Sequence, residues 1–174
     1  MLKYIIKELS MLRVVFMRHG HYDWQTPDNL SPQGVAQVLA SVQKLKAVGV
    51  EPERIVSTPV TRGKETALIV ADKLGGKLTG EIIFDPKLDE TGNTKFLRSL
   101  QAMPDGVHSV FAVSHAMTIS EMMSVLLTKE VRSEFFLDMD GLPHGGVAII
   151  DVEGADRCAD IKPNTATKYE IVLP

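Results

Sequence analysis

Cysteine is nearly absent from this sequence: one residue, Cys158, occurs among 174. A single thiol excludes a disulfide within the chain and suits a reducing compartment. Cys158 stands in a polar stretch with no cysteine or histidine beside it. We therefore interpret it as a thiol without a chemical role.

Long apolar runs are missing as well, and none approaches the length of a membrane span. The opening stretch MLKYIIKELS is too short and too charged for a secretory signal, and no small-residue cleavage site follows it. We expect a cytoplasmic protein without a membrane partner, in which residues 1–10 form an N-terminal extension and residues 11–174 one domain.

The sequence has no excess of basic charge. Lysine and arginine number 19 against 22 aspartates and glutamates, for a net charge of −3. This balance argues against nucleic acid or an anionic membrane as the main partner. Any anion site must therefore be a local cluster of cations. With 44% hydrophobic and 24% charged residues, the chain is typical of a soluble globular domain with its own core.

Strand-like and helix-like segments alternate along the chain, which predicts an α/β fold. Short apolar runs predict strands at 12–17, 54–57, 81–84, 109–114, 147–152 and 169–173. Helical spacing of apolar residues predicts helices at about 32–47, 59–74, 94–102, 116–127 and 130–137. We expect a three-layer α/β/α sandwich around a mainly parallel sheet of about six strands.

Two of these helices are expected to begin with the same signal. Ser31-Pro32 and Thr58-Pro59 each place a capping hydroxyl before a proline at the first helical position. A helix that begins just after a strand offers free backbone N–H groups and a partial positive charge, which favour phosphate.

Cationic or titratable side chains follow three of the predicted strands. They are Arg18-His19-Gly20 after the first strand, Arg62 shortly after the second, and His115 after the strand at 109–114. Ligands bind at the carboxyl edge of such sheets. Arginine matches the oxygens of phosphate, and glycine allows a sharp turn close to a ligand. The sequence therefore predicts a phosphate site at this edge.

Five segments in this order resemble the signature of the histidine phosphatase superfamily, also called phosphoglycerate-mutase-like. They are FMRHG at 16–20, LSPQGVAQ at 30–37, STPVTRGKETA at 57–67, LDE at 88–90 and VSHAMTI at 113–119. The resemblance covers roughly residues 12–150. In length and compactness the chain is most similar to the short bacterial phosphohistidine phosphatases.

The resemblance implies a role for each matching residue. His19 would be the nucleophile that forms a phosphohistidine, and Arg18 and Arg62 would bind the phosphoryl oxygens. His115 would complete the pocket and donate a hydrogen bond or positive charge to the transferring group. Glu90, which matches the L-x-E element, would give a proton to the leaving oxygen.

The chemistry of phosphoryl transfer agrees with these roles. The reaction needs positioning and preorganised positive charge more than covalent work by the protein. A neutral imidazole is a competent nucleophile near pH 7, and neither a metal nor a cofactor is required. We expect a metal-independent phosphatase that hydrolyses phosphate monoesters or phosphohistidine, on a phosphorylated small molecule or a phosphoprotein.

Three other functions fit parts of the pattern. A phosphoglycerate-mutase-type phosphotransferase would carry a long insertion before the second histidine, whereas only 24 residues separate Glu90 from His115. A metal-dependent hydrolase could use His19 and His21, but arginines stand where further ligands are expected. A catalytically silent phosphoryl-binding protein would be expected to lack the nucleophile. The short phosphohistidine phosphatases often lack an acid at the Glu90 position, so an acid there favours ester substrates.

Other residues near these motifs allow simpler interpretations. His21 either lines the mouth of the pocket or faces solvent from a loop. His144, in the segment LPHGG before a predicted strand, could approach the rim of the pocket, but we expect it to be a turn residue. The methionines of the helix after His115, Met117 among them, are expected to pack in the core.

Overall fold

One six-stranded sheet forms the centre of the protein in a computed structural model, which describes residues 11–25, 28–92, 94–138, 141–155 and 157–174. The expected N-terminal extension, residues 1–10, lies outside the described residues. The strands are β1 (Met11–Arg18), β2 (Arg54–Ser57), β3 (Ile83–Phe84), β4 (Ser109–Ser114), β5 (Val147–Glu153) and β6 (Ala166–Val172). The helices are α1 (Pro32–Ala47), α2 (Thr61–Leu74), α3 (Lys95–Gln101), α4 (Ala116–Leu126) and α5 (Lys129–Asp138).

The strand order is β3-β2-β4-β1-β5-β6. The first four strands of this order pair in parallel, so their carboxyl ends lie at the same edge of the sheet. β5 and β6 are antiparallel additions beside β1. The sheet is therefore mostly parallel, as predicted, and the start of β5 meets the end of β1, where Met17 pairs with Val147.

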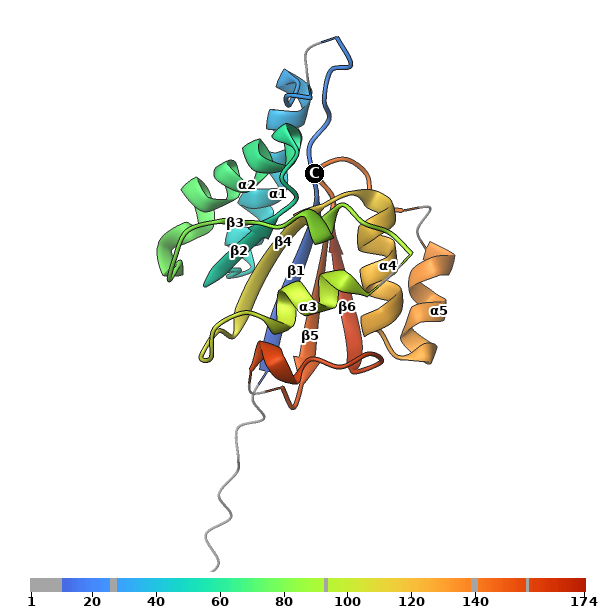
Figure 1. Ribbon diagram of the computed structural model, residues 1–174. Helices are drawn as coiled ribbons and strands as arrows, with labels where there is room; N and C mark the ends of the chain where they lie inside the picture. The colour runs from blue at the N-terminus through green and yellow to red at the C-terminus, as the bar shows by residue number, and fades with distance from the viewer. Residues whose placement is uncertain (1–10, 26–27, 93, 139–140, 156) are drawn as a thin grey trace, which may run out of the picture.

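Helices cover both faces of the sheet (Figure 1). α1 and α2 pack on one face, and α3, α4 and α5 pack on the other. β1 shows the consequence in its sequence. Val14 and Phe16 face one helical layer, Val15 and Met17 face the other, and all four side chains are fully buried. A strand covered on both sides needs such a continuous apolar run.

α1 begins as the sequence predicts. The hydroxyl of Ser31 accepts a hydrogen bond from the Gly34 backbone N–H at 3.1 Å, and Pro32 is the first helical residue. The helix ends at Ala47, and Gly49 follows with a φ of 75°. The left-handed backbone at that position favours glycine.

The expected start of α2 is wrong by two residues. The helix begins at Thr61 rather than at Pro59, and its cap, Val60, makes no side-chain hydrogen bond. Thr58 does not cap the helix because its buried hydroxyl donates to the carboxylate of Asp89. This later start places Arg62 in the first turn of α2.

Candidate active site

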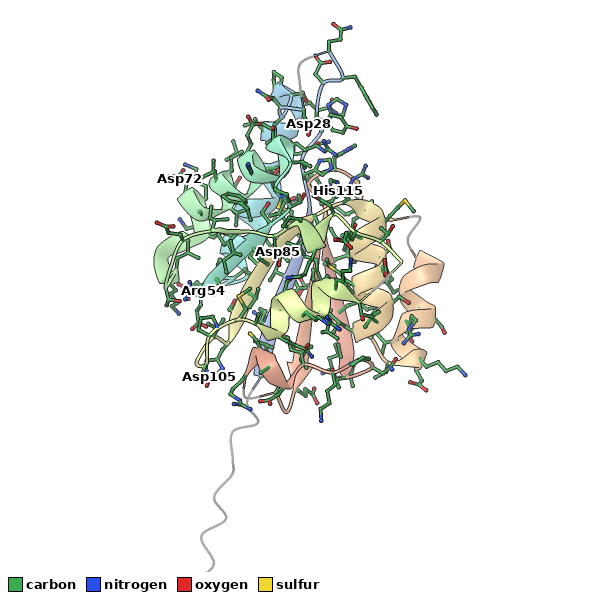
Figure 2. The ribbon with its side chains drawn as sticks, viewed as in Figure 1. Asp28, Arg54, Asp72, Asp85, Asp105 and His115 are labelled. Atoms are coloured by element: carbon green, nitrogen blue, oxygen red, sulfur yellow. The ribbon has the colours of Figure 1, made fainter. Side chains whose placement is uncertain are left out.

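A pocket of about 440 Å³ opens at the carboxyl edge of β1 and β4. Its lining includes Arg18, His19, Arg62 and His115, four side chains predicted for the phosphate site. They come from the end of β1, the first turn of α2 and the residue before α4. Figure 2 places Asp28 and His115 at this end of the sheet, with Asp105 at the opposite end.

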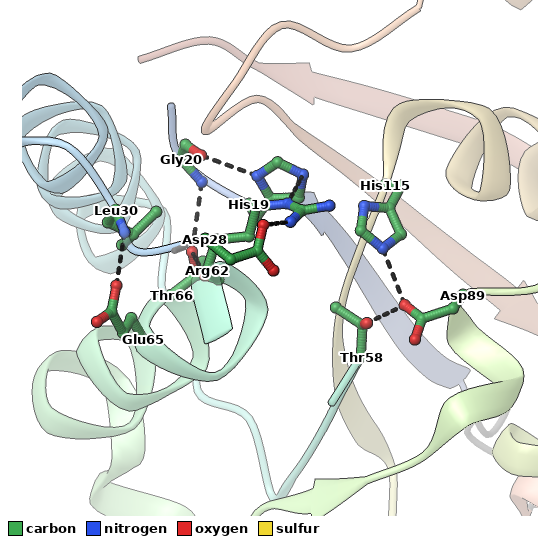
Figure 3. A network of polar contacts seen from close by, with 10 residues as sticks. All are labelled: His19, Gly20, Asp28, Leu30, Thr58, Arg62, Glu65, Thr66, Asp89 and His115. Atoms are coloured by element: carbon green, nitrogen blue, oxygen red, sulfur yellow. Dashed lines mark hydrogen bonds and ion pairs between the residues drawn. The ribbon is translucent and has the colours of Figure 1, made fainter. Parts of the chain in front are cut away.

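The loop after β1 is fixed in place by α1 and α2. A Cβ atom added to Gly20 would lie 2.5 Å from the carbonyl oxygen of Gly34, so the loop and the first turn of α1 touch through their backbones. From α2, Thr66 Oγ1 accepts the Gly20 N–H at 3.3 Å (Figure 3). These contacts hold the segment around His19 rigidly against both helices.

His19 is almost fully buried, with 3% of its surface exposed, although it lines the pocket. Its Nδ1 lies 2.8 Å from the carbonyl oxygen of Gly20 and must donate to it. Its Nε2 accepts a hydrogen bond from Nε of Arg62 at 3.1 Å (Figure 3). These two bonds assign the tautomer: the proton is on Nδ1 and the lone pair is on Nε2.

The surroundings of His19 keep the ring neutral. Burial lowers the pKa of His19 to about 3, and the nearby charge of Arg62 acts in the same direction. Desolvation disfavours the protonated ring because its charge loses contact with water. Near neutral pH, Nε2 therefore carries an available lone pair, as a nucleophile requires.

Arg62 is held in position by three contacts. Besides its bond to His19, its Nη1 forms an ion pair with Asp28, and its guanidinium lies over the ring of Tyr22 at 4.4 Å. The cation over the aromatic face adds a stabilising contact. Arg62 thus presents a fixed positive charge beside Nε2 of His19.

Arg18 is held by the segment that precedes β5. Its Nη1 donates to the carbonyl oxygen of Leu142 at 2.8 Å, and its Nη2 donates to Nε2 of His144 at 3.0 Å. Its Nε is buried and has no hydrogen-bond partner in the part of the chain that the structure describes. An oxygen of a bound anion is a suitable acceptor for such a donor.

The second predicted histidine, His115, is paired with a carboxylate. Its Nε2 lies 2.9 Å from Oδ1 of Asp89, which also accepts from Thr58 (Figure 3). The ring centroids of His115 and His19 are 5.1 Å apart. Figure 3 shows the other nitrogen of His115 on the side facing His19.

The structure separates the two adjacent acidic residues of the LDE segment. Asp89 lines the pocket, whereas Glu90 is not among the lining residues and forms an ion pair with Lys95. Leu88 is fully buried just before them and fixes which way the chain turns. Sequence reasoning missed Asp89 because spacing alone does not tell which of two neighbouring carboxylates faces a pocket.

His144 is a further site residue that the sequence prediction missed. It lines the pocket instead of serving only in a turn, and its ring centroid lies 5.4 Å from that of His19. Burial lowers the pKa of His144 to about 4, and the charge of Arg18 adds to the effect. The neutral ring accepts the Arg18 N–H, so it orients that guanidinium.

His21 and Met117 also belong to the pocket. His21 lines it and its Nδ1 lies 2.8 Å from the hydroxyl of Ser31, in agreement with the first of its two interpretations. Met117 is 75% exposed at the pocket, so the expectation of core packing is wrong for it, while Met122 and Met123 are buried as expected. Met117 is the second residue of α4 and precedes Thr118 and Ile119, the first residues of the helix that are buried.

The described residues contain no group of three or more histidine, cysteine or acidic side chains placed to hold a metal ion. Within the same residues, every helix is too short or too polar to cross a membrane.

Residues 14–103 match the model of the histidine phosphatase superfamily (branch 1). The chain belongs to the histidine phosphatase superfamily. This stretch contains Arg18, His19 and Arg62, while His115 and His144 lie beyond it. A search of curated proteins gave no match.

Solved structures of other superfamily members share the fold. The provisionally assigned phosphohistidine phosphatase SixA from Nakamurella multipartitia is 19% identical, with a TM-score of 0.71 over 92% of this chain and 95% of that one. A protein histidine phosphatase SixA complexed with tungstate is 22% identical, with a TM-score of 0.66 over 91% and 96%. A mycobacterial glucosyl-3-phosphoglycerate phosphatase is 16% identical, with a TM-score of 0.65 over 94% and 98%. At these identities the likeness concerns the fold.

Proposed function

We propose that the protein is a metal-independent phosphatase that hydrolyses phosphate monoesters or phosphoramidates through a phosphohistidine on His19. The observation that carries this proposal is the pair of hydrogen bonds to the His19 ring, which leave the lone pair on Nε2. Arg62 beside that nitrogen, and Arg18 in the same pocket lining, supply the charge that a phosphoryl group needs.

The proposed first step forms a bond between Nε2 of His19 and phosphorus and breaks the bond from phosphorus to the leaving atom. When the substrate binds, the Nε–H of Arg62 stops donating to Nε2 of His19 and donates to a phosphoryl oxygen instead. Arg18, in the same pocket lining, adds a second positive charge. In the second step water attacks phosphorus, the N–P bond breaks, and inorganic phosphate leaves. A tungstate complex of one SixA relative supports a site for a tetrahedral oxyanion.

We assign proton transfer to the pair formed by Asp89 and His115. Asp89 accepts the Nε2 proton of His115, so the ring presents Nδ1 toward His19 and the leaving atom. In the protonated ring, whose positive charge the Asp89 carboxylate offsets, Nδ1 gives its proton to the leaving group in the first step and takes a proton back from the attacking water in the second. Glu90 remains the alternative acid that the family motif predicts.

Hydrolysis is favoured over phosphate transfer to a second hydroxyl. The residues between Asp89 and His115 include α3 and β4, and α3 buries Phe96, Leu97 and Leu100 in the core. Of the described residues between Asp89 and His115, Thr91 alone lines the pocket, so α3 and β4 leave it open to water. A mutase needs water excluded while the phosphoenzyme waits for its acceptor.

Trapping the intermediate tests the proposal. Acid-labile, base-stable label should appear on the wild-type protein after a brief reaction with a radiolabelled phosphate ester, and His19→Ala should show neither label nor turnover. His108→Ala is the matched control because His108 is exposed and far from the pocket lining. Turnover should persist after treatment with EDTA. Label retained in His19→Ala, or activity lost with the chelator and restored by metal, would overturn the proposal.

A further inference from the structure

Two highly exposed apolar side chains line the pocket. Among the described residues, the two large apolar side chains with the greatest exposure are Trp24, at 85%, and Met117, at 75%. Both line the same pocket. Single exposed apolar side chains are common, but two beside one polar site indicate contact with a ligand.

Two successive contacts of aromatic rings connect Trp24 to Arg62. The guanidinium of Arg62 lies over Tyr22, and the Tyr22 ring lies 5.0 Å from that of Trp24. A group bonded to a phosphate that Arg62 holds therefore extends past Tyr22 toward Trp24. The large exposed area of Trp24 leaves it available to a flat ring.

The charges around the pocket disfavour a second anion on the substrate. Of the described lining residues, only Arg18 and Arg62 carry a permanent positive charge, and both are needed for the phosphoryl group. Asp89 adds a negative charge to the same lining. A carboxylate or second phosphate on the leaving group would meet apolar rings and a carboxylate, without a cation to pair with.

We infer that the substrate's leaving group is a flat, uncharged aryl ring that packs against Trp24 and Met117, as in a free aryl phosphate or a phosphotyrosine side chain. This inference rests on the proposed phosphatase function, because it places the phosphoryl group at Arg62 and His19. It goes further by assigning the part of the substrate that the enzyme releases.

Phosphonates test the inference without any chemical step. Benzylphosphonate should bind about tenfold more tightly than methylphosphonate, from one added ring contact, while phosphonoacetate should bind no better than methylphosphonate. Trp24 is the sole tryptophan of the chain, so its fluorescence reports binding directly. Benzylphosphonate should change this emission more than saturating methylphosphonate does.

Variants locate the effect. Met117→Ala, whose fluorescence still reports binding, should reduce the preference for benzylphosphonate to about threefold or less. Trp24→Ala, followed by competition against p-nitrophenyl phosphate turnover, should do the same. Leu68→Ala is the control because Leu68 is also exposed, at 56%, and does not line the pocket. An unchanged preference in both rim variants, or tighter binding of phosphonoacetate, would overturn the inference.

The outcome is separable from the proposed function. Fluorescence titration needs no turnover, so failure of catalysis would not hide binding at the rim. If the wild-type enzyme forms phosphohistidine but does not prefer benzylphosphonate over methylphosphonate, the proposed function stands and the inference about the ring is wrong. Comparison of kcat/KM for phenyl phosphate and a short phosphotyrosine peptide then identifies the source of the ring, since a protein substrate should give the peptide the higher value.

Discussion

A hydrogen bond links Arg62 to His19: Nε of the guanidinium donates to Nε2 of the imidazole at 3.1 Å. An imidazole nitrogen accepts a hydrogen bond only while it carries no proton. The contact therefore selects the neutral ring and leaves the lone pair on Nε2, the nitrogen that we propose attacks phosphorus. It also holds Arg62, the cation proposed to bind the phosphoryl oxygens, beside that nitrogen.

Burial of neutral His19 predicts a loss of stability in mild acid. Its folded-state pKa of about 3 lies below its ordinary value of 6.5, so the unfolded chain takes up a proton that the folded protein does not. The stabilisation is present above about pH 6.5 and declines as the pH falls toward 3. From this group alone we expect a decrease of about 2 kcal/mol in the free energy of unfolding between pH 7 and pH 5.

Urea denaturation at several pH values measures this decrease. His144 contributes in the same direction, because its pKa is lowered to about 4. His19→Asn should show a clearly shallower decline than the wild type, and His108→Asn should follow the wild type. A stability profile that is level from pH 7 to pH 5 would contradict the buried neutral ring.

The assignment of the proton donor predicts a contrast between two neighbouring carboxylates. Asp89→Asn should lower kcat for an alkyl phosphate by about 100-fold, and that for p-nitrophenyl phosphate much less, because the nitrophenolate leaves without a proton. Glu90→Gln should change both rates by less than about threefold. If Glu90→Gln instead shows the selective loss, the motif identifies the acid and the structure-based assignment is wrong.

His144 should act through Arg18. His144→Ala removes the acceptor of the Arg18 Nη2 proton, and we expect kcat/KM to fall about tenfold, mainly through KM for the phosphorylated substrate. His144→Gln places an amide oxygen near the position of Nε2, restores an acceptor and should recover most of this loss. If the alanine and glutamine variants are equally impaired, the ring has a different role from orienting Arg18.

The contact between α1 and the loop after β1 predicts that Gly34→Ala is destabilising. Alanine would gain about 1 kcal/mol from helix propensity, but its Cβ would overlap the backbone of His21. We expect a net loss of about 2 kcal/mol, measured by thermal or urea unfolding. Gly76→Ala is the control, since a Cβ there would meet nothing within 4 Å. A Gly34→Ala protein as stable as the wild type would disprove the close contact.

Most of the fold could be predicted from the sequence because its signals are local. β2 and β4 occupy the predicted residues, and α1 begins and ends at its predicted cap and last residue. The start of α2 could not be predicted in this way. Thr58 has the local form of a cap, but Asp89, 31 residues later, takes its hydroxyl.

The site shows the same division. Arg18, His19, Arg62 and His115 follow parallel strands, so the rule for the carboxyl edge brings them together. His144 precedes β5, which pairs antiparallel with β1, and no pattern in the sequence indicates that pairing. Its place in the pocket depends on strand order, a property of the whole sheet.

The position of β5 also has a consequence for biogenesis. The turn that carries His144 and the carbonyl of Leu142 reaches Arg18 only when β5 has docked beside β1. A nascent chain that has emerged from the ribosome only as far as β4 already contains His19, yet Arg18, one of the two arginines of the pocket, lacks its anchors. The ability to bind phosphate should therefore appear late in synthesis, after β5 has paired with β1.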